Sequence, residues 1–517
     1  MAETTTTYEV DDAGLTAVLS ARNDVVLEHA TGQGRFSCAE GPFDDYLRTV
    51  SSVPLGDGRH RVTETTHWSL AVPIWGPLFR PLVRRLLTRD AVPRAPRDPS
   101  ESPPMPPWWS PPARLEARSA EVLSLLCGLS LLAGYLGTVI AQTITFAADE
   151  FGASNAAQGT TLAAVRVGVL ASLVVMVLAD RRGRQKLLVV CAVGGTLAAA
   201  AGALAPDLVI LGGTQTVSRA FSTALALLIA VVAAEEMPAG GRAYAASVLA
   251  MTAALGAGMA VVILPVADLG EPAWRLVYVA PLVFLPMFLS VGRKLPESRR
   301  FLRSHATVTM AGHRWRLALL AVSAFFALLF LTPNSQFQNE FLRDEHGFSA
   351  LQLTLFTIGT STPAGIGIVV GGRLADTRGR RRVGAIGMVG GAVLLALAYQ
   401  VSGIWLVAAS LVGSMVAAVT VPALAVYGPE LFPTSLRGRA NGYLSVAGVL
   451  GSGAGLAIAG RLADHYGRFG PGIALLGVGP LIVAALVLGF YPETAHLELE
   501  ELNPEDAPAT ALTGPLG

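Results

Sequence analysis

Long apolar runs, separated by short charged turns, make up the chain from about residue 121 to residue 491. Each run is close to the ~20 residues that a membrane-spanning helix needs. The pattern predicts an all-α polytopic membrane protein with twelve transmembrane helices. Their expected bounds are 121–147, 158–179, 186–205, 208–234, 244–266, 273–292, 315–338, 350–374, 383–400, 404–429, 438–461 and 470–491.

One charged turn occurs twice, each time between two apolar runs. Residues 178–184 return as residues 374–380, which places Asp180 and Asp376 in equivalent positions, 196 residues apart (376 − 180). A fixed interval of this kind predicts a duplicated unit, here two pseudo-symmetric halves of six helices each. Other landmarks repeat at nearly the same interval: Glu235, Pro238 and Arg242 with Glu430, Pro433 and Arg437, and Pro296-Glu297-Ser298 with Pro492-Glu493-Thr494. The expected division is 119–300 for the first half, 301–314 for a loop, 315–492 for the second half and 493–517 for a tail.

The distribution of basic residues between the loops predicts the orientation of the helices. Arginine and lysine follow the second, sixth and eighth runs, whereas the alternate loops are acidic or mixed. Basic loops belong on the cytoplasmic side of a membrane. We therefore expect both termini, the inter-half loop and the tail to be cytoplasmic, in a multi-pass protein of the cell membrane.

The first 90 residues follow a different, more polar pattern. Residues 61–70 are rich in β-forming side chains and come after the turn signal at 56–58, with 35–38 and 46–50 as candidate partner strands. We predict a small soluble α+β domain at 1–90. A proline-rich, extended linker follows at 91–118.

The end of this domain is predicted to be an amphipathic helix, from about Pro77 to Asp90. Its apolar side chains fall on one face, and its arginines lie elsewhere. A basic amphipathic helix can lie on an anionic inner leaflet, or it can close the core of the small domain. We expect the second arrangement, because soluble amphipathic helices are the commoner case.

Composition excludes several classes of function. The chain is 52% hydrophobic and only 15% charged, against about 25% charged residues in soluble domains. Its arginines fall in loops between apolar runs, so we expect no nucleic-acid partner. The membrane part has no nucleophile–base arrangement, metal-ligand spacing or phosphate-binding glycine loop. We therefore expect no enzyme, no cofactor and no direct use of ATP.

Over about residues 114–502 the sequence resembles the major facilitator superfamily. Residues 372–380 match the family's charged loop pattern in full, while Met176 replaces the family's glycine in the first copy. The landmarks at 430–437 and 492–494 look like those of the sugar-porter and metabolite–proton symporter branches. Arg182 and Arg378 stand where sugar porters usually carry an apolar residue, which favours general metabolite transport.

This resemblance implies a secondary transporter that works by alternating access on a small-molecule substrate, in the lipid bilayer and with protons as a coupled ion. We expect a monomer. Two alternatives stay open: a transporter-like membrane sensor that signals through its N-terminal domain, and a drug or metabolite exporter. The exporter is the weaker of these, because the fifth run lacks the glycine-proline signatures of antiporters.

The repeated charged residues are candidates for a gate between the two halves. A carboxylate and a guanidinium at the membrane edge attract each other more strongly than on an open surface. We expect Glu235 to pair with Arg242, and Glu430 with Arg437. Such pairs would hold the two halves together when the transporter faces outward, and would part when it faces inward. The alternative is that the charges only end helices and fix topology. The predicted gating set is Asp180, Arg184, Glu235, Arg242, Asp376, Arg380, Glu430 and Arg437.

Polar side chains inside membrane spans are expensive and are functional candidates by default. Those of the fourth span lie at i, i+4 and i+7 and share one helical face. In the seventh span Pro333 is expected to interrupt the helix beside several amides. In the resembled family, the first, fourth, seventh and tenth helices line the central cavity. The candidate substrate-binding residues are Gln142, Gln215, Arg219, Ser222, Asn334, Gln338 and Tyr427.

Arg219 is the sharpest of these candidates, because a mid-span arginine costs at least about 2.5–3.5 kcal/mol unless its charge is answered. Arg166 is a second cation within a span, and no carboxylate lies near the middle of any span. We expect Asp149 or Glu150 to pair with Arg166, which leaves Arg219 for an anionic, carboxylate-bearing substrate. The alternative for Arg219 is a contact with backbone carbonyls. The candidate coupling residues are Asp149, Glu150 and Arg166; proton coupling follows from the resemblance, and facilitated diffusion stays open.

Overall fold

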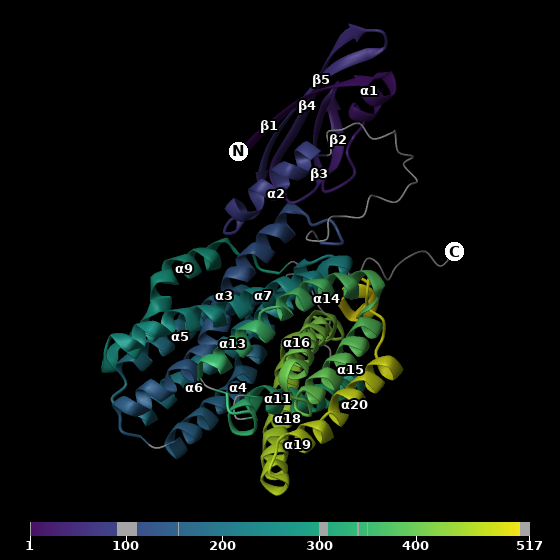
Figure 1. The fold of residues 1–517 in the computed structure, drawn as a ribbon. Helices are drawn as coiled ribbons and strands as arrows, with labels where there is room; N and C mark the ends of the chain where they lie inside the picture. Colours follow the sequence, from purple (N-terminus) through teal and green to yellow (C-terminus); the bar gives the residue numbers. More distant parts are fainter. Residues whose placement is uncertain are drawn as a thin grey trace. The chain divides into compact units, whose positions relative to one another are not determined.

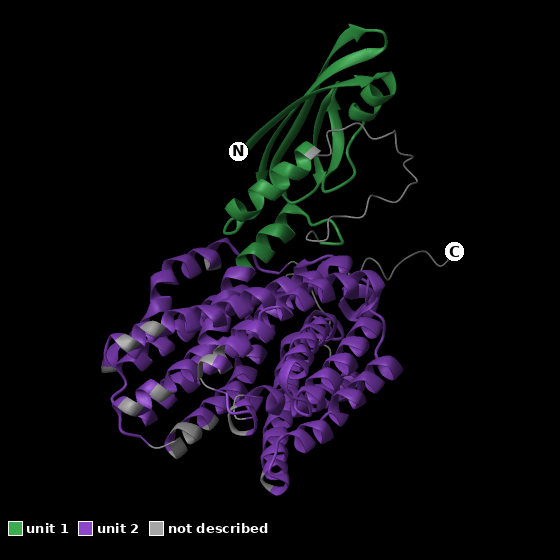
Figure 2. Cartoon of the chain, viewed as in Figure 1, with its two compact units in different colours: residues 1–125 green, residues 126–517 purple. Residues whose placement is uncertain are grey.

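The computed structural model describes residues 2–89, 111–153, 155–298, 309–338, 341–348 and 350–506. It divides into two compact units, residues 1–125 and 126–517 (Figure 2). Most of the predicted linker and most of the inter-half loop lie outside the described residues.

Unit 1 contains a five-stranded antiparallel sheet with strand order β1-β5-β4-β3-β2 (Figure 1). The expected strand at 61–70 is β5, and the two candidate partner strands lie within β3 and β4; β1 and β2 were not predicted. Asp57 and Gly58 have positive φ and close the tight turn between β4 and β5. The strands are β1 Ala2–Asp11, β2 Leu27–Gly32, β3 Arg35–Glu40, β4 Phe43–Gly56 and β5 Arg59–Leu70.

Two helices, α1 (Asp12–Val18) and α2 (Gly76–Arg89), complete the soluble part of this unit. Val83 and Leu87 of α2 pack with Trp68 and other residues in one buried cluster. The predicted amphipathic helix therefore closes the core, as expected from its pattern. The small α+β domain predicted for the N-terminus is confirmed.

Unit 2 is helical, and its helices continue the apolar pattern of the sequence (Figure 1). Eleven helices among the described residues are long and apolar enough to cross a membrane. The expected second span is also a helix, α4, of which several residues lie outside the described set. The first half comprises α3 Ala117–Glu150 (which begins in unit 1), α4 Asn155–Arg182, α5 Arg184–Ala201, α6 Leu208–Glu236, α7 Arg242–Ile263, α8 Arg275–Val279 and α9 Leu285–Lys294.

The second half repeats this order. Its bounds are α11 Arg314–Gln336, α13 Ala350–Ser361, α14 Ala364–Arg378, α15 Arg380–Ala398, α16 Gly403–Ala425, α17 Tyr427–Glu430, α18 Arg437–Tyr466, α19 Gly470–Leu476 and α20 Val478–Phe490. One expectation was wrong: α11 continues through Pro333 to Gln336, so this proline does not interrupt the helix. A proline near a helix end breaks few backbone hydrogen bonds, which explains its tolerance here.

Glycine contacts show that the two halves pack alike. A Cβ on Gly256 of α7 would lie 1.8 Å from the carbonyl oxygen of Leu131 on α3. A Cβ on Gly451 of α18 would lie 2.1 Å from the carbonyl oxygen of Phe325 on α11. The first and fifth spans of each half thus approach at backbone distance, as small residues permit in membranes. The twofold organisation predicted from the repeat is present in the helices.

Candidate functional site

Two aspartates cap helices that belong to the opposite half. Asp180, near the end of α4, accepts hydrogen bonds from the backbone N–H groups of Gly438 (3.0 Å) and Arg439 (2.9 Å) in the first turn of α18. Asp376, near the end of α14, accepts one from the N–H of Tyr244 (2.9 Å) in the first turn of α7. A carboxylate at a helix N-terminus satisfies free N–H groups and complements the helix dipole. Each half therefore holds a helix end of the other.

The ion pairs also cross between the halves. Arg437 Nη1 lies 2.7 Å from Glu235 Oε1, and Arg242 Nη1 lies 3.4 Å from Glu430 Oε1, with all four side chains fully buried. This corrects the pairing within each half that we expected from the sequence. The reason is that each arginine begins a helix, α7 or α18, that packs against α14 or α4 of the opposite half. Its guanidinium therefore faces the opposite glutamate.

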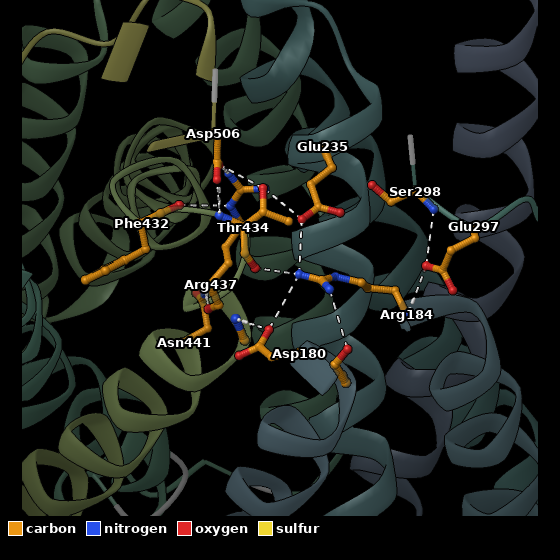
Figure 3. A network of polar contacts seen from close by, with 12 residues as sticks. Asp180, Arg184, Glu235, Glu297, Ser298, Phe432, Thr434, Arg437, Asn441 and Asp506 are labelled. Atoms are coloured by element: carbon orange, nitrogen blue, oxygen red, sulfur yellow. Dashed lines mark hydrogen bonds and ion pairs between the residues drawn. The ribbon is translucent and has the colours of Figure 1, made fainter. Parts of the chain in front are cut away.

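Arg184 links this first network together, as Figure 3 shows. Its Nη2 lies 3.4 Å from Glu235 and 3.5 Å from Asp180, and it donates a 2.7 Å hydrogen bond to the carbonyl of Thr434 in the other half. The side chain is 1% exposed. A buried cation of this kind is tolerated only because several oxygen atoms lie close enough to offset its charge.

Arg380 occupies the equivalent place in the second network. It lies 3.0 Å from Asp376, forms an ion pair with Glu430, and donates a 3.2 Å hydrogen bond to the carbonyl of Ala239 in the first half. The two arginines of the repeated turn thus make the same three kinds of contact. All eight predicted gating residues lie in these two networks, at the end of the helices that carries the basic turns.

Two glutamates of the repeated Pro-Glu-Ser/Thr landmarks accept hydrogen bonds from the backbone of Arg184 and Arg380. Glu297 accepts a 2.9 Å hydrogen bond from the backbone N–H of Arg184, at the start of α5. Glu493 accepts one of the same length from the N–H of Arg380, at the start of α15. The sequence identified these glutamates as repeat landmarks but gave no contact for them. Because each glutamate binds the start of a helix in its own half, both copies keep the same spacing between this landmark and the charged turn.

The C-terminal segment adds residues that sequence reasoning missed. Asp506 lies 3.3 Å from Arg437, and Glu498 lies 3.3 Å from Arg242. Asn503 donates a 2.7 Å hydrogen bond to the last carbonyl of α17. In the sequence, these contacts could have been suspected from the acidic residues that follow the last apolar run, because their charge balances that of the basic turns. These contacts give each crossing arginine a second carboxylate.

Arg219 lies away from these networks, on the face of α6 that meets α3 and α4. Its Nη1 donates a 2.8 Å hydrogen bond to the carbonyl of Gly137 on α3, and its Nε has no partner among the described residues. Arg166 of α4 is close enough to act on it electrostatically. A Cβ on Gly168 would lie 3.2 Å from the Cβ of Arg219, so α4 makes room for the side chain. The contact with a backbone carbonyl, which was the alternative to substrate binding, is present.

The other residues of α6 do not join Arg219 in one site. Gln215 is buried and donates a 3.3 Å hydrogen bond to the carbonyl of Ala199 on α5. Ser222 donates to the carbonyl of Arg219 in its own helix, at 3.2 Å. The spacing predicted that these residues share one site. Instead, Gln215 contacts α5 and Arg219 contacts α3. Gln215 has a helix-packing contact in place of the predicted site role.

Of the remaining substrate candidates, Asn334 of α11 has a buried polar atom without a partner in the described part of the chain: the side chain is 8% exposed, and the atom is Oδ1. Gln142 and Gln338 are half-buried. Tyr427 is fully buried, and its hydroxyl donates a 3.0 Å hydrogen bond to the carbonyl of Pro492. The predicted role of Tyr427 is corrected, because it belongs to the packed charged end.

Glu150 does not answer the charge of Arg166. It forms a 2.7 Å ion pair with Arg275 and accepts a 2.6 Å hydrogen bond from the indole N–H of Trp274. The hydrogen bond from Arg275 holds the pKa of Glu150 below its usual range. The side chain of Asp149 lies outside the described residues. The predicted Glu150–Arg166 pair is therefore wrong, and the Asp149–Arg166 pair stays a prediction.

Comparisons with known proteins agree with this architecture. A family model described as "Major Facilitator Superfamily" matches residues 317–514. The solved structure of the proton:xylose symporter XylE is 19% identical, with 75% of this chain and 99% of that chain covered and a TM-score of 0.66. The fucose:proton symporter FucP of E. coli is 15% identical, with 71% and 97% covered and a TM-score of 0.58.

Two curated relatives match shorter segments. The cis,cis-muconate transport protein of Acinetobacter baylyi is 29% identical over 157 residues, and the myo-inositol transporter 2 of Cryptococcus neoformans is 32% identical over 166 residues. The matches cover 30% and 29% of this chain, and 38% and 28% of those relatives.

The duplicated helical fold, joined by crossed charges at one end, is shared with the two solved membrane transporters. The second half of the chain is therefore similar to the Major Facilitator Superfamily model, and the helical fold is shared with the two solved structures.

Proposed function

We propose that this protein is a secondary transporter that moves a small anionic metabolite across the cell membrane by alternating access. One observation carries the proposal: the ion pairs Glu235–Arg437 and Glu430–Arg242 run between the two halves. Charges that only ended helices would be satisfied within their own half. Rocking of one half against the other must break both pairs at once.

The network is suited to a gate with two stable positions. Breaking a buried ion pair by removing one partner costs about 3–5 kcal/mol, because an unanswered charge is left behind. When the halves part and water enters, the same groups become hydrated and that cost falls. The gate therefore resists partial opening while allowing full opening. This supports an assignment of the structure to the state closed at the basic end.

Arg219 and Arg166 support an anionic substrate. Two guanidinium groups, one on α4 and one on α6, favour a negatively charged ligand, and Glu150 is engaged elsewhere. The relative named as a cis,cis-muconate transport protein is consistent with this class, because muconate is a dicarboxylate. In this proposal Arg219 binds the carboxylate, and Gln142, Asn334 and Gln338 contact its polar groups.

Proton coupling is the finer part of the proposal, and both solved structures described above are of proton symporters. Glu150 is a poor proton carrier, because Arg275 holds it ionised. This leaves Asp149 as the candidate, with Arg166 as its partner in the ionised form. Uptake that is unchanged when the pH gradient is abolished would favour facilitated diffusion.

Uptake of radiolabelled cis,cis-muconate into proteoliposomes tests the substrate class. We expect saturable uptake by the wild type and at least a tenfold loss in Arg219→Gln, with partial recovery in Arg219→Lys because the charge returns. Arg461→Gln is the matched control, since Arg461 is an exposed arginine of α18 outside the site. Normal uptake by Arg219→Gln would contradict the anion assignment.

The cytoplasmic placement of both termini follows from the basic turns, and fusions test it. A reporter that is active only in the cytoplasm should be active at both ends of the chain and in the turn at Arg181. Activity at one terminus alone would overturn the orientation.

A further inference from the structure

The soluble part of unit 1 is hydrogen-bonded to the beginning of the first candidate span. The backbone N–H of Ile74 donates a 3.4 Å hydrogen bond to Ser124 Oγ, and the indole N–H of Trp75 donates a 3.2 Å hydrogen bond to the carbonyl of Ser124. Arg114, just before α3, donates a 2.6 Å hydrogen bond to Asn23 Oδ1. All of these residues belong to unit 1. The residues that immediately precede α2 are therefore held against the first turns of α3.

Ser124 lies at the level of the membrane surface. Glu121 is the last charged residue before an uncharged run of 27 residues, 122–148 (148 − 121). At 1.5 Å per residue this run is about 40 Å long, whereas the hydrocarbon core is about 30 Å thick. The excess leaves about one helical turn at each end for the headgroup region, and Ser124 lies in the first turn. Tryptophan is enriched at this level, as Trp75 is here, so α2 begins at the membrane surface.

One face of α2 closes the core of the domain, and another face of the same helix is exposed and apolar. Val83 and Leu87 pack with Trp68 in the buried cluster of the domain. Leu78 and Leu82 are 67% and 41% exposed. They are four residues apart and therefore share a face. A helix on a soluble surface usually carries polar residues on the face that points away from the core, so these two leucines need another explanation.

Arginines accompany the exposed leucines. Arg80, Arg84 and Arg85 are exposed, and α2 contains no acidic residue. Exposed arginines are common on soluble surfaces and by themselves indicate no ligand. Here they occur beside exposed leucines, on a helix that begins at the level of the lipid headgroups. That combination is typical of helices that lie on an anionic membrane surface.

We propose that the exposed face of α2 lies on the lipid leaflet at which α3 begins and binds anionic lipid headgroups. Leu78 and Leu82 enter the leaflet between the headgroups, and the three arginines bind the lipid phosphates. Val83 and Leu87 stay in the core, so the helix closes the domain and contacts the membrane at the same time. The surface is separate from the transport route, because α2 is not one of the candidate spans.

Spin labels on the full-length protein in nanodiscs test this placement, after replacement of the three cysteines. The helix label is attached at Leu78→Cys. The matched control is a hairpin label at Val53→Cys, because Val53 is an apolar residue of the same unit that is 61% exposed. Val53 pairs with Arg61, seven residues along β5 (68 − 61) from Trp68, which packs on α2. Oxygen is concentrated in lipid and a polar nickel chelate stays in water, so the ratio of their collision rates with a label reports its depth.

In nanodiscs that contain phosphatidylglycerol, we expect this ratio to be at least threefold higher for the helix label than for the hairpin label. Arg80→Gln/Arg84→Gln/Arg85→Gln should lower the ratio of the helix label to that of the hairpin label, as should purely zwitterionic lipid. The corresponding triple substitution by lysine should keep the high ratio. The control Arg59→Gln/Arg61→Gln, which removes two exposed arginines of β5, should leave it unchanged. Circular dichroism should show that all variants are folded.

Three results would overturn the proposal. The first is a helix label that is as open to the nickel chelate as the hairpin label in both kinds of lipid. The second is a helix label shielded from both reagents, which would show that protein covers this face of α2. The third is a high ratio that persists in zwitterionic lipid and in the triple glutamine variant, since the headgroup charge would then play no part. No transport is measured, so the outcome does not depend on the proposed substrate.

Discussion

At the scale of single residues, the charged end depends on which arginine meets which glutamate. Glu235 and Arg242 are close in the sequence, yet Glu235 pairs with Arg437 and Arg242 with Glu430. The repeat was sufficient to predict that these four residues act together. It could not predict their partners, because both pairings have the same spacing and only the packing of α7 and α18 distinguishes them.

A double-mutant cycle checks the crossed pairing. Glu235→Gln and Arg437→Gln should couple by about 1 kcal/mol or more, because each alone leaves a buried charge. Glu235→Gln and Arg242→Gln should couple by less than about 0.5 kcal/mol. The measurement is the free energy of thermal or denaturant unfolding in one detergent. The opposite order of the two coupling energies would contradict the crossed pairs.

Glu150 gives a pH dependence of stability whose sign can be worked out. Its pKa is lowered in the folded protein, so the ionised form stabilises the fold above the ordinary glutamate pKa of about 4.3. This stabilisation is lost as the pH falls through the lowered value. The melting temperature of Glu150→Gln should therefore lie below that of the wild type at pH 7, and the difference should shrink in acid. A gap that is the same at both pH values would argue against the ion pair.

At the scale of elements, α18 and α7 each begin in contact with the opposite half of the protein, and the backbone of their first turns lies close to that half. A Cβ on Gly438 would lie 2.6 Å from Asp180 Oδ1 and 2.9 Å from the carbonyl oxygen of Met176. No such contact exists at Gly453 of the same helix, where an added Cβ has open space. The two positions differ in their surroundings while sharing a helix.

Gly438→Ala and Gly453→Ala should therefore have effects of opposite sign. At Gly438 the methyl group must displace the capping carboxylate, so we expect a loss of about 1–3 kcal/mol and reduced transport. At Gly453 alanine should stabilise the helix by about 0.5–1 kcal/mol, because it lowers the entropy lost on folding. Melting temperatures measured side by side check this. Equal effects at both positions would remove the argument from close approach.

Some strands of the N-terminal domain could be predicted from the sequence and others could not, for physical reasons. β5 follows a tight turn at Asp57-Gly58, and both features are visible in the sequence. β1 is an edge strand rich in threonine, with no clear alternation of apolar and polar residues. Its place in the sheet depends on pairing with β5 across about sixty residues of chain, and no local pattern records such a contact.

At the scale of the whole molecule, two copies of a six-helix unit hold each other at one end, and the C-terminal segment covers that end. The copy number, the charged turns and the membrane class followed from apolar periodicity and the repeat. The contacts of Glu498, Asn503 and Asp506 did not, because these residues have no counterpart in the repeated landmarks.

Truncation tests the contribution of this segment. A chain that ends after residue 506 keeps every tail contact described above and should transport as the full chain does. A chain that ends after residue 496 loses the second carboxylate of both crossing arginines. We expect lower thermal stability and reduced transport for the shorter chain only. Equal behaviour of the two truncations would show that the tail contacts do not matter.

The central claim is that the crossed charges close one end of a transporter that must open there. Distances between spin labels on Arg182 and Thr377, exposed residues of the two basic turns, measure this directly in nanodiscs after replacement of the three cysteines. We predict a short-distance population in the parent protein and a longer-distance population in Glu235→Gln/Glu430→Gln. One distance distribution, unchanged by that double substitution, would contradict the account.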